Sequence, residues 1–159
     1  MERRTEKSMK GHGIPCNKYN PYAWILGEPD IGEGTWIGAF TLLDAKFASL
    51  KIGKGCDISS GTQILTHSTA KRCISERKYN KVDFKSIEIG DHVFIGTNVT
   101  ILMGAKIGHH SIIAAGSVVP ENMNVLPYSL VAGVPAKIKK NIKEEVEILI
   151  KDGNEDTSN

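Results

Sequence analysis

The sequence is poor in aromatic residues, in cysteine and in long apolar runs, and each shortage excludes a class of protein. Only 6% of the 159 residues are Phe, Trp or Tyr. No apolar run reaches the roughly 18 residues that suggest a transmembrane helix. The three cysteines, Cys16, Cys56 and Cys73, are an odd number at unrelated spacings, so they predict neither a disulfide framework nor a zinc site. We therefore expect a cytoplasmic, reducing setting without membrane insertion.

The chain also lacks a clear excess of either positive or negative charge. The chain has 20 Lys and Arg against 18 Asp and Glu, a net charge of +2. Because no basic block dominates, a dedicated nucleic-acid binder is not expected. The opening residues MERRTEKSMKGHG contain no apolar stretch and do not resemble a secretory signal. The length suits one domain, and 40% hydrophobic residues are enough for a core.

What the sequence does contain is a six-residue repeat. Aliphatic side chains recur every six positions in three series: Ile25, Ile31, Ile37, Leu43; then Ile52, Ile58, Ile64; then Ile89, Ile95, Ile101, Ile107, Ile113, Val119, Val125, Val131. This period excludes an amphipathic helix, which repeats at 3.6, and a long strand, which repeats at 2. It fits a short strand followed by a sharp turn. Three such units close a triangular coil of about 18 residues.

Glycines and small residues follow the same period. Gly comes directly after the aliphatic residue in six units, namely Gly32, Gly38, Gly53, Gly90, Gly96 and Gly108. A small side chain stands four residues after the aliphatic one, as at Thr62, Ala105 and Ser117. We expect both inward positions to fill the prism, and the glycines to serve the turns by adopting positive φ. The predicted fold class is all-β, a parallel β-helix over residues 21–140.

Two stretches interrupt the repeat, and the two ends fall outside it. Residues 44–51 lengthen one corner by three residues, and residues 65–88 form a polar, basic excursion. Insertions at the corners of a repeat fold commonly build its binding face. Residues 141–151 carry apolar side chains at helical spacing and predict a short helix that caps or flanks the prism. Residues 1–20 are expected to be partly disordered or to lie over the first coil, and 152–159 to be a disordered tail.

The segment from Trp24 to Lys140 resembles the hexapeptide-repeat acyltransferases, most of all the sugar O- and N-acetyltransferases of surface-polysaccharide and nucleotide-sugar biosynthesis. The stretches that carry this resemblance are IGEGTWIGAFTLLDA, ISSGTQILTHST, IEIGDHVFIGTNVTILMGAKIGHHSIIAAGSVV and LVAGVPAKIKK. The resemblance implies a left-handed β-helix and a homotrimer with active sites in the clefts between prisms. It also implies acetyl-CoA as the donor substrate, no metal, and a histidine at the rim as general base.

His67 is the candidate catalytic residue. An imidazole accepts a proton readily near neutral pH, and His67 stands where the prism passes into the excursion, in the family's ILTH context. Ser68 and Asp44 are candidate substrate-binding residues. Ser68 follows the histidine where related sequences often carry an acid, so the group that orients His67 is left open between Glu76 and a backbone carbonyl. Asp44 falls at the lengthened corner, where an acid lies near the acceptor sugar in similar enzymes; the alternative is a turn-forming Asp.

The same resemblance assigns the cofactor contacts by position. Phe94 and Thr97 stand where the family lines the pantetheine channel, and Ala115 stands where the backbone meets the pantetheine arm. Pro120 occupies the place of a family threonine, which removes a hydroxyl and an amide donor there. The basic residues near the nucleotide phosphates are Lys137 and Lys140, since Lys offers a point charge to phosphate; a solvated basic patch is the alternative.

The remaining histidines and the tryptophans have simpler interpretations. His92, His109 and His110 occupy variable corner positions and are interpreted as solvated turns. Trp24 and Trp36 each precede a repeat aliphatic, so they should point outward, against a neighbouring subunit or a terminal segment.

Two other classes of function stay open. A γ-class carbonic anhydrase shares this prism but needs three histidines converging on zinc across a subunit boundary, two of them close in sequence. No histidine here has a second one five residues on. A non-catalytic β-helical scaffold would keep the repeat without needing His67. Within the transferase interpretation, the acceptor could also be an antibiotic, and either a hydroxyl or an amine.

Overall fold

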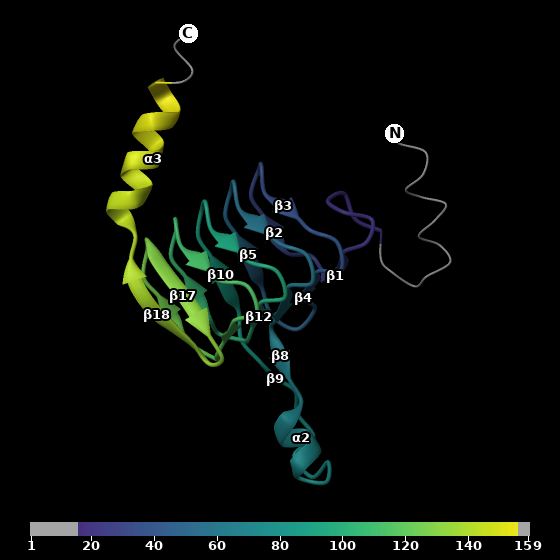
Figure 1. Ribbon diagram of the computed structural model, residues 1–159. Helices are drawn as coiled ribbons and strands as arrows, with labels where there is room; N and C mark the ends of the chain where they lie inside the picture. The colour runs from purple at the N-terminus through teal and green to yellow at the C-terminus, as the bar shows by residue number, and fades with distance from the viewer. Residues whose placement is uncertain (1–15, 156–159) are drawn as a thin grey trace.

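The computed structural model describes residues 16–155, which form a three-sided parallel β-helix with two projections (Figure 1). Sheet A contains β1 (Trp24–Gly27), β4 (Leu42–Ala45), β7 (Gln63–Leu65), β12 (Thr100–Ile101) and β15 (Val118–Val119). Sheet B contains β2 (Asp30–Ile31), β5 (Leu50–Ile52), β10 (Ile87–Ile89), β13 (Lys106–Ile107) and β16 (Asn124–Val125). Sheet C contains β3 (Trp36–Ile37), β6 (Asp57–Ile58), β11 (Phe94–Ile95), β14 (Ile112–Ile113), β17 (Ser129–Gly133) and β18 (Ala136–Asn141).

The six-residue period fills the prism as the sequence predicts. All of the repeat aliphatics except Ile31 are buried, with exposed fractions of 8% or less. Strands of successive coils pair in parallel and in register, so each aliphatic side chain lies above another: Ile95 pairs with Ile58 below it and Ile113 above it. The small residues, such as Thr62 and Ala105, are also buried. One continuous apolar core therefore runs along the prism, and no coil could bury its face alone.

The repeat glycines are needed for a different reason from the predicted one. Positive φ occurs at other positions, such as Gly61 and Gly116, and not at the glycine that follows each aliphatic residue. That glycine lies against the backbone of the next coil. A Cβ on Gly96 would lie 2.5 Å from the backbone nitrogen of Ala115, and one on Gly108 would lie 2.3 Å from that of Pro127. The requirement is close contact between stacked coils.

Each corner of the prism is an edge along which turns stack. The A–B edge comprises 28–29, 46–49, 66–86, 102–105 and 120–123; the B–C edge comprises 32–35, 53–56, 90–93, 108–111 and 126–128; the C–A edge comprises 38–41, 59–62, 96–99 and 114–117. Both interruptions of the repeat fall on the A–B edge. The excursion forms a hairpin of β8 (His67–Ser68) and β9 (Asp83–Phe84) with the short helix α2 (Ala70–Ile74) between them, and it projects from the prism (Figure 1).

The chain closes the last coil with a strand rather than with the predicted helix. β18 turns back and pairs antiparallel with β17. The helix α3 (Lys143–Glu155) then leads away from the prism (Figure 1). Its apolar side chains Val146, Leu149 and Ile150 line one cavity together with His92 and His110 of the B–C edge, so the helix flanks that edge. The helix begins later than predicted and continues beyond residue 151.

The start of the described chain lies against the first coil. The side-chain amide of Asn20 donates to the carbonyl of Ile37 at 3.0 Å. The rest of the predicted N-terminal segment, 1–15, and the last four residues of the predicted tail, 156–159, lie outside the described residues. No helix within residues 16–155 has the length and apolar composition to cross a membrane.

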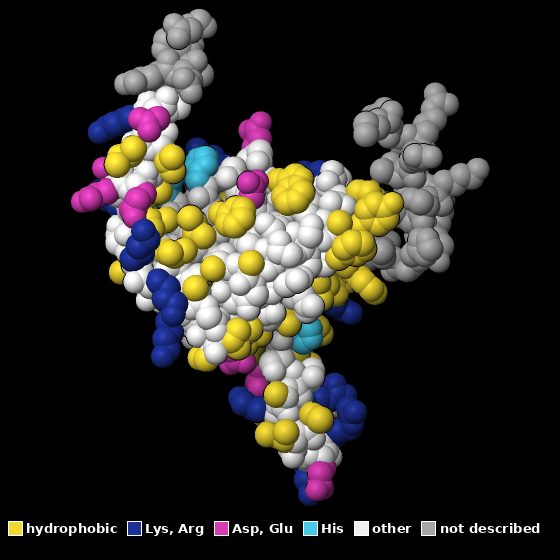
Figure 2. All heavy atoms as spheres, in the orientation of Figure 1, with side chains coloured by type: hydrophobic (Ala, Val, Ile, Leu, Met, Phe, Trp, Pro, Cys, Tyr) yellow, Lys and Arg dark blue, Asp and Glu magenta, His cyan; other side chains and the backbone are white. Residues whose placement is uncertain are grey.

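Charge is distributed unevenly over the surface. Figure 2 shows that charged side chains gather on α3 and on the excursion, whereas the visible face of the prism between them carries mostly hydrophobic and uncharged groups. The outward row of sheet C runs through Trp36, Asp57, Phe94 and Ile112 in register, and its three apolar members, Trp36, Phe94 and Ile112, are 53%, 44% and 36% exposed. The corresponding row of sheet B is polar, with Lys51, Glu88 and Lys106 in register.

Candidate active site

The two interruptions of the repeat meet at His67. Asp44 in β4 pairs with Leu65 in β7, which places the lengthened corner directly beneath the start of the excursion. The hydroxyl of Thr66 donates to the carbonyl of Asp44 at 2.8 Å and fixes this junction. His67 follows as the first residue of β8.

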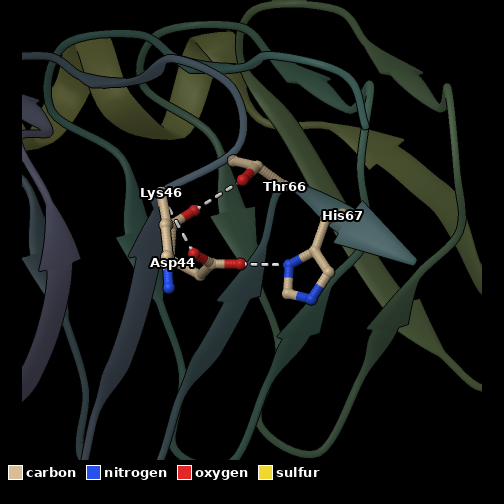
Figure 3. Close-up of polar contacts among 4 residues, drawn as sticks. All are labelled: Asp44, Lys46, Thr66 and His67. Atoms are coloured by element: carbon tan, nitrogen blue, oxygen red, sulfur yellow. Dashed lines mark hydrogen bonds and ion pairs between the residues drawn. The ribbon is translucent and has the colours of Figure 1, made fainter. Parts of the chain in front are cut away.

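The carboxylate of Asp44 orients the imidazole of His67. Asp44 Oδ2 bonds to His67 Nδ1, and Asp44 Oδ1 accepts a hydrogen bond from the backbone nitrogen of Lys46 at 3.0 Å (Figure 3). The side chain of Asp44 is 2% exposed and that of His67 is 30% exposed. A carboxylate can only accept, so in the neutral imidazole Nδ1 carries the proton and Nε2 has the lone pair that a base needs. Nε2 lies on the side of the ring away from Asp44 (Figure 3).

This arrangement supplies the orienting group that the sequence left open. The partner is Asp44, and Glu76, the candidate considered from sequence, forms an ion pair with Lys78 instead. The alternative view of Asp44 as a turn-forming residue also holds, because it accepts from the backbone two residues on. Both of its oxygens are therefore engaged within the chain.

Two phenylalanines that sequence reasoning missed lie next to His67. The ring of Phe47 lies 4.4 Å from the ring of His67, centroid to centroid, at an interplanar angle of 38°. Phe84 is the direct partner of His67 in the β8–β9 pair. Phe47 and Phe84 are 39% and 56% exposed. The signal that could have found them is their position inside the two interruptions.

The excursion is braced by a polar cluster beyond the site. Asp83 accepts a hydrogen bond from the hydroxyl of Tyr79 at 2.8 Å and pairs with Lys71 at 3.1 Å. These bonds from Tyr79 and Lys71 lower the pKa of Asp83 below its ordinary value. Ser68, the second predicted substrate contact, accepts from the backbone nitrogen of Ala70 at 3.2 Å at the start of α2. Its position beside His67 is compatible with the prediction, which stays a prediction.

The predicted cofactor residues do not converge within one chain. Pro120 lies on the A–B edge, as His67 does, whereas Thr97 and Ala115 lie on the C–A edge. Phe94 points outward from sheet C.

The two lysines of the set lie on β18, and they differ in their surroundings. Lys140 forms an ion pair with Glu145 at 2.6 Å, which lowers the pKa of that glutamate. Lys137 is exposed. Of the two, Lys137 is thus the better placed to meet a phosphate, since Lys140 would first have to leave its partner.

A second cluster of polar side chains occupies the B–C edge. The rings of His92 and His110 lie 5.0 Å apart, and the ring of Tyr128 stacks on His110 at 5.1 Å. All three residues have positive φ, where L side chains are strained. Burial, followed by the charges of His92 and His109, lowers the pKa of His110 below its ordinary value. A groove of about 710 Å³ runs beside these residues along sheet B.

The potential metal ligands and the cysteine nucleophiles form no second reactive site among residues 16–155. Among residues 16–155, no three or more His, Cys, Asp or Glu side chains are arranged to hold a metal ion. All three cysteines are free, and burial raises the pKa of the Cys56 thiol. Cys56 faces the core as its repeat position predicts, which makes its thiol unreactive.

The stacked coils and the repeat define the class: the chain is a hexapeptide-repeat protein with the left-handed parallel β-helix fold. Residues 86–121 match the family model described as bacterial transferase hexapeptide (six repeats). The hexapeptide-repeat acetyltransferase VCA0836 of Vibrio cholerae is 36% identical, with a TM-score of 0.64, over 72% of this chain and 63% of that one. Its complex with acetyl coenzyme A has also been solved and matches with 37% identity and a TM-score of 0.63.

Curated relatives extend the similarity to two kinds of enzyme. A probable macrolide acetyltransferase of Lysinibacillus sphaericus is 36% identical over 121 residues, which is 64% of this chain and 66% of that protein. Gamma carbonic anhydrase 2 of Arabidopsis thaliana is 27% identical over 136 residues, 79% of this chain. The match spans about half, 48%, of the carbonic anhydrase's own length.

Proposed function

We propose that this protein is an acetyl-CoA-dependent acetyltransferase that acetylates a hydroxyl or amino group of a sugar, with His67 as the general base. The observation that carries the proposal is the Asp44–His67 pair, in which a buried carboxylate holds a partly exposed imidazole at Nδ1. Similarity at 36% identity to acetyltransferases supports the reaction type. The sugar acceptor rests on the sequence resemblance to the sugar acetyltransferases.

The reaction needs one proton transfer and no covalent enzyme intermediate. Nε2 of His67 takes the proton of the acceptor as its oxygen or nitrogen attacks the thioester carbonyl carbon. The carbon–sulfur bond breaks as the tetrahedral intermediate collapses, and the imidazolium returns the proton to the departing thiolate. Asp44 keeps Nδ1 protonated throughout and stabilises the imidazolium while it exists. We assign Asp44 a positioning role rather than the direct sugar contact expected from sequence, because both its oxygens are engaged.

We further propose that the working enzyme is a homotrimer. Acetyl-CoA would be held by Phe94, Thr97, Ala115, Pro120 and Lys137, with Lys140 after release from Glu145. These residues lie on different edges of one chain, so a cleft between two subunits would bring the sets together. The three exposed apolar side chains on sheet C, Trp36, Phe94 and Ile112, support such packing, because burying aromatic surface of this kind dominates interface energetics. Light scattering combined with size-exclusion chromatography measures the mass of the assembly in solution and so tests the homotrimer.

Thiol release tests the activity. The protein is incubated with acetyl-CoA and a panel of nucleotide-linked and simple sugars, and free thiol is followed with His67→Ala in parallel. His109→Ala is the matched control, because it removes an exposed imidazole from another edge. We expect release that depends on one acceptor class and falls by roughly 10²–10⁴-fold in His67→Ala alone. Thiol release that is unchanged in His67→Ala would reject His67 as the general base, while the acetyltransferase activity itself would still stand.

Two other outcomes would favour the two alternative functions, a zinc metalloenzyme and a non-catalytic scaffold. The similarity to a plant gamma carbonic anhydrase is the observation that favours a metalloenzyme. Stoichiometric zinc in the purified protein, with CO₂ hydration that a chelator abolishes, would support that function. No thiol release together with no binding of coenzyme A by calorimetry would support a non-catalytic scaffold.

A further inference from the structure

We propose that Phe47 and Phe84 form the acceptor-binding surface beside His67, and that they select an acceptor ring with a continuous face of C–H groups. This inference rests on the proposed function, since it defines the substrate class of the same site. It starts from the position of the two rings. Each interruption of the repeat contributes one exposed phenylalanine next to His67. Phe47 of the lengthened corner contacts the imidazole, and Phe84 of the excursion is paired with His67 across the hairpin.

Both phenylalanines lie next to His67, Phe47 by ring contact and Phe84 by strand pairing. Phe47 contacts His67 directly, with ring centroids 4.4 Å apart. Phe84 faces His67 across the β8–β9 pair, and directly paired residues in antiparallel strands project from the same side with Cβ atoms about 4.5–5.5 Å apart. His67 therefore has one aromatic ring in contact with its imidazole and a second aromatic residue paired with it across the hairpin, and its Nε2 is directed away from Asp44 (Figure 3).

Exposure of these rings needs an explanation that packing does not provide. The chain has only four phenylalanines, and two of them neighbour His67, Phe47 through its ring and Phe84 through strand pairing. Neither Phe47 nor Phe84 reaches the core, because they are 39% and 56% exposed. The polar cluster of Tyr79, Lys71 and Asp83 braces the excursion without them. An aromatic surface next to a base gains energy when an apolar face of a ligand covers it.

The chemistry of the rings indicates the kind of acceptor. A phenylalanine ring offers no hydrogen bond, so it recognises flat apolar surface and not hydroxyl groups. A pyranose such as galactose presents contiguous C–H groups on one face while its hydroxyls point outward. Laid on the rings, such a sugar would bring a hydroxyl or amine toward Nε2 of His67. An acyclic polyol with the same hydroxyls has no rigid face and would bind less well, because ordering it costs conformational entropy.

Ligand-observed NMR tests the surface without requiring turnover. Saturation is transferred from the full-length protein to methyl β-galactopyranoside, with galactitol as the acyclic comparison. We expect strong transfer to the ring C–H protons of the galactoside and weak transfer to galactitol. Phe47→Ala and Phe84→Ala should each reduce the transfer to the galactoside, while Phe40→Ala, which removes a 76% exposed ring on the C–A edge, should not. Equal transfer in all four proteins overturns the proposal.

Steady-state kinetics separates binding from support of His67. With the pyranose acceptor found by thiol release, each substitution should raise the KM for that acceptor roughly three- to tenfold and leave the KM for acetyl-CoA unchanged. Phe47→Leu should keep part of the effect because it keeps apolar surface. A fall in kcat with unchanged acceptor KM would mean that the rings only position His67, which also overturns the proposal. If the wild-type protein releases no thiol with any acceptor, the proposed function fails, and the NMR result decides separately on the aromatic surface.

Discussion

Replacing Asp44 with asparagine tests the central feature of the site with almost no change in shape. The side-chain carbonyl oxygen of the asparagine could still accept from the backbone nitrogen of Lys46. Its amide group, however, would face His67 Nδ1 with a donor in place of an acceptor. The imidazole then satisfies that donor with Nδ1 and carries its proton on Nε2. The base is therefore protonated at the atom that must accept the proton.

The size of the effect follows from what the imidazole contributes. A positioned general base supplies about 10²–10⁴-fold in rate, or about 3–5 kcal/mol of transition-state stabilisation. Asp44→Asn should lose most of this, so its kcat should approach that of His67→Ala. The double variant should lose little more than either single variant, because both remove the same function. The side chain is 2% exposed, so solvent cannot replace the missing acceptor.

The assay is thiol release at saturating acetyl-CoA and acceptor, with Asp30→Asn as the control. Asp30 is an exposed carboxylate on sheet B, and its loss should leave the rate within twofold of wild type. Circular dichroism confirms that Asp44→Asn keeps the β-helix. A folded Asp44→Asn protein with a rate within tenfold of wild type would refute the assignment of Asp44 as the group that orients His67.

Three further predictions concern the fold and the B–C edge. Gly96→Ala should destabilise the protein more than Gly116→Ala in urea unfolding, because the new Cβ at 96 meets backbone at 2.5 Å, whereas at 116 nothing lies within 4 Å and only the strain of its positive φ of +70° is added; equal losses would contradict the role of coil contact. Ile95→Ala, at a side chain that is 0% exposed, should cost about 2–5 kcal/mol of unfolding free energy, and a cost below about 1 kcal/mol would mean that the core is loosely packed. His110 has a lowered pKa in the folded state, so the unfolded state binds its proton first and stability falls as pH drops through the ordinary histidine range. The melting temperature of His110→Asn should therefore fall less than that of wild type between pH 7.5 and 5.5, and identical slopes would reject this source of pH dependence.

The repeat was readable from sequence because its physical cause is local and periodic. Each coil must place an aliphatic side chain inward at the same point of the same turn, so these residues recur every six positions within each series. Ile95 and Ile113 of one series stack in register, and Ile58 of the preceding series stacks on Ile95. The role of the repeat glycines was predicted wrongly for a related reason. Sequence shows that Gly96 is needed, but the atom that excludes a Cβ belongs to the next coil, eighteen or more residues away.

The start and end of the excursion were also visible in sequence, because the period stops there, but its hairpin was not. β8 and β9 pair through residues about fifteen positions apart, and neither has an alternation of apolar and polar residues long enough to predict a strand. The C-terminal helix was predicted from its spacing over residues 141–151 and is observed over Lys143–Glu155, whereas β18 before it pairs with the free edge of β17, which the sequence pattern did not indicate.

The candidate base and its partner show most clearly what sequence decided and what only the tertiary structure decided. The sequence by itself determined the β-helix, its core, and His67 as the histidine at the interruption, because these follow from periodicity and from the motif around that residue. It could not determine that Asp44 orients His67 or that Phe47 and Phe84 lie next to it. Those residues are 23, 20 and 17 positions from His67 along the chain. They meet only because consecutive coils stack in parallel, which carries one corner onto the next, and because the excursion folds back on itself as a hairpin.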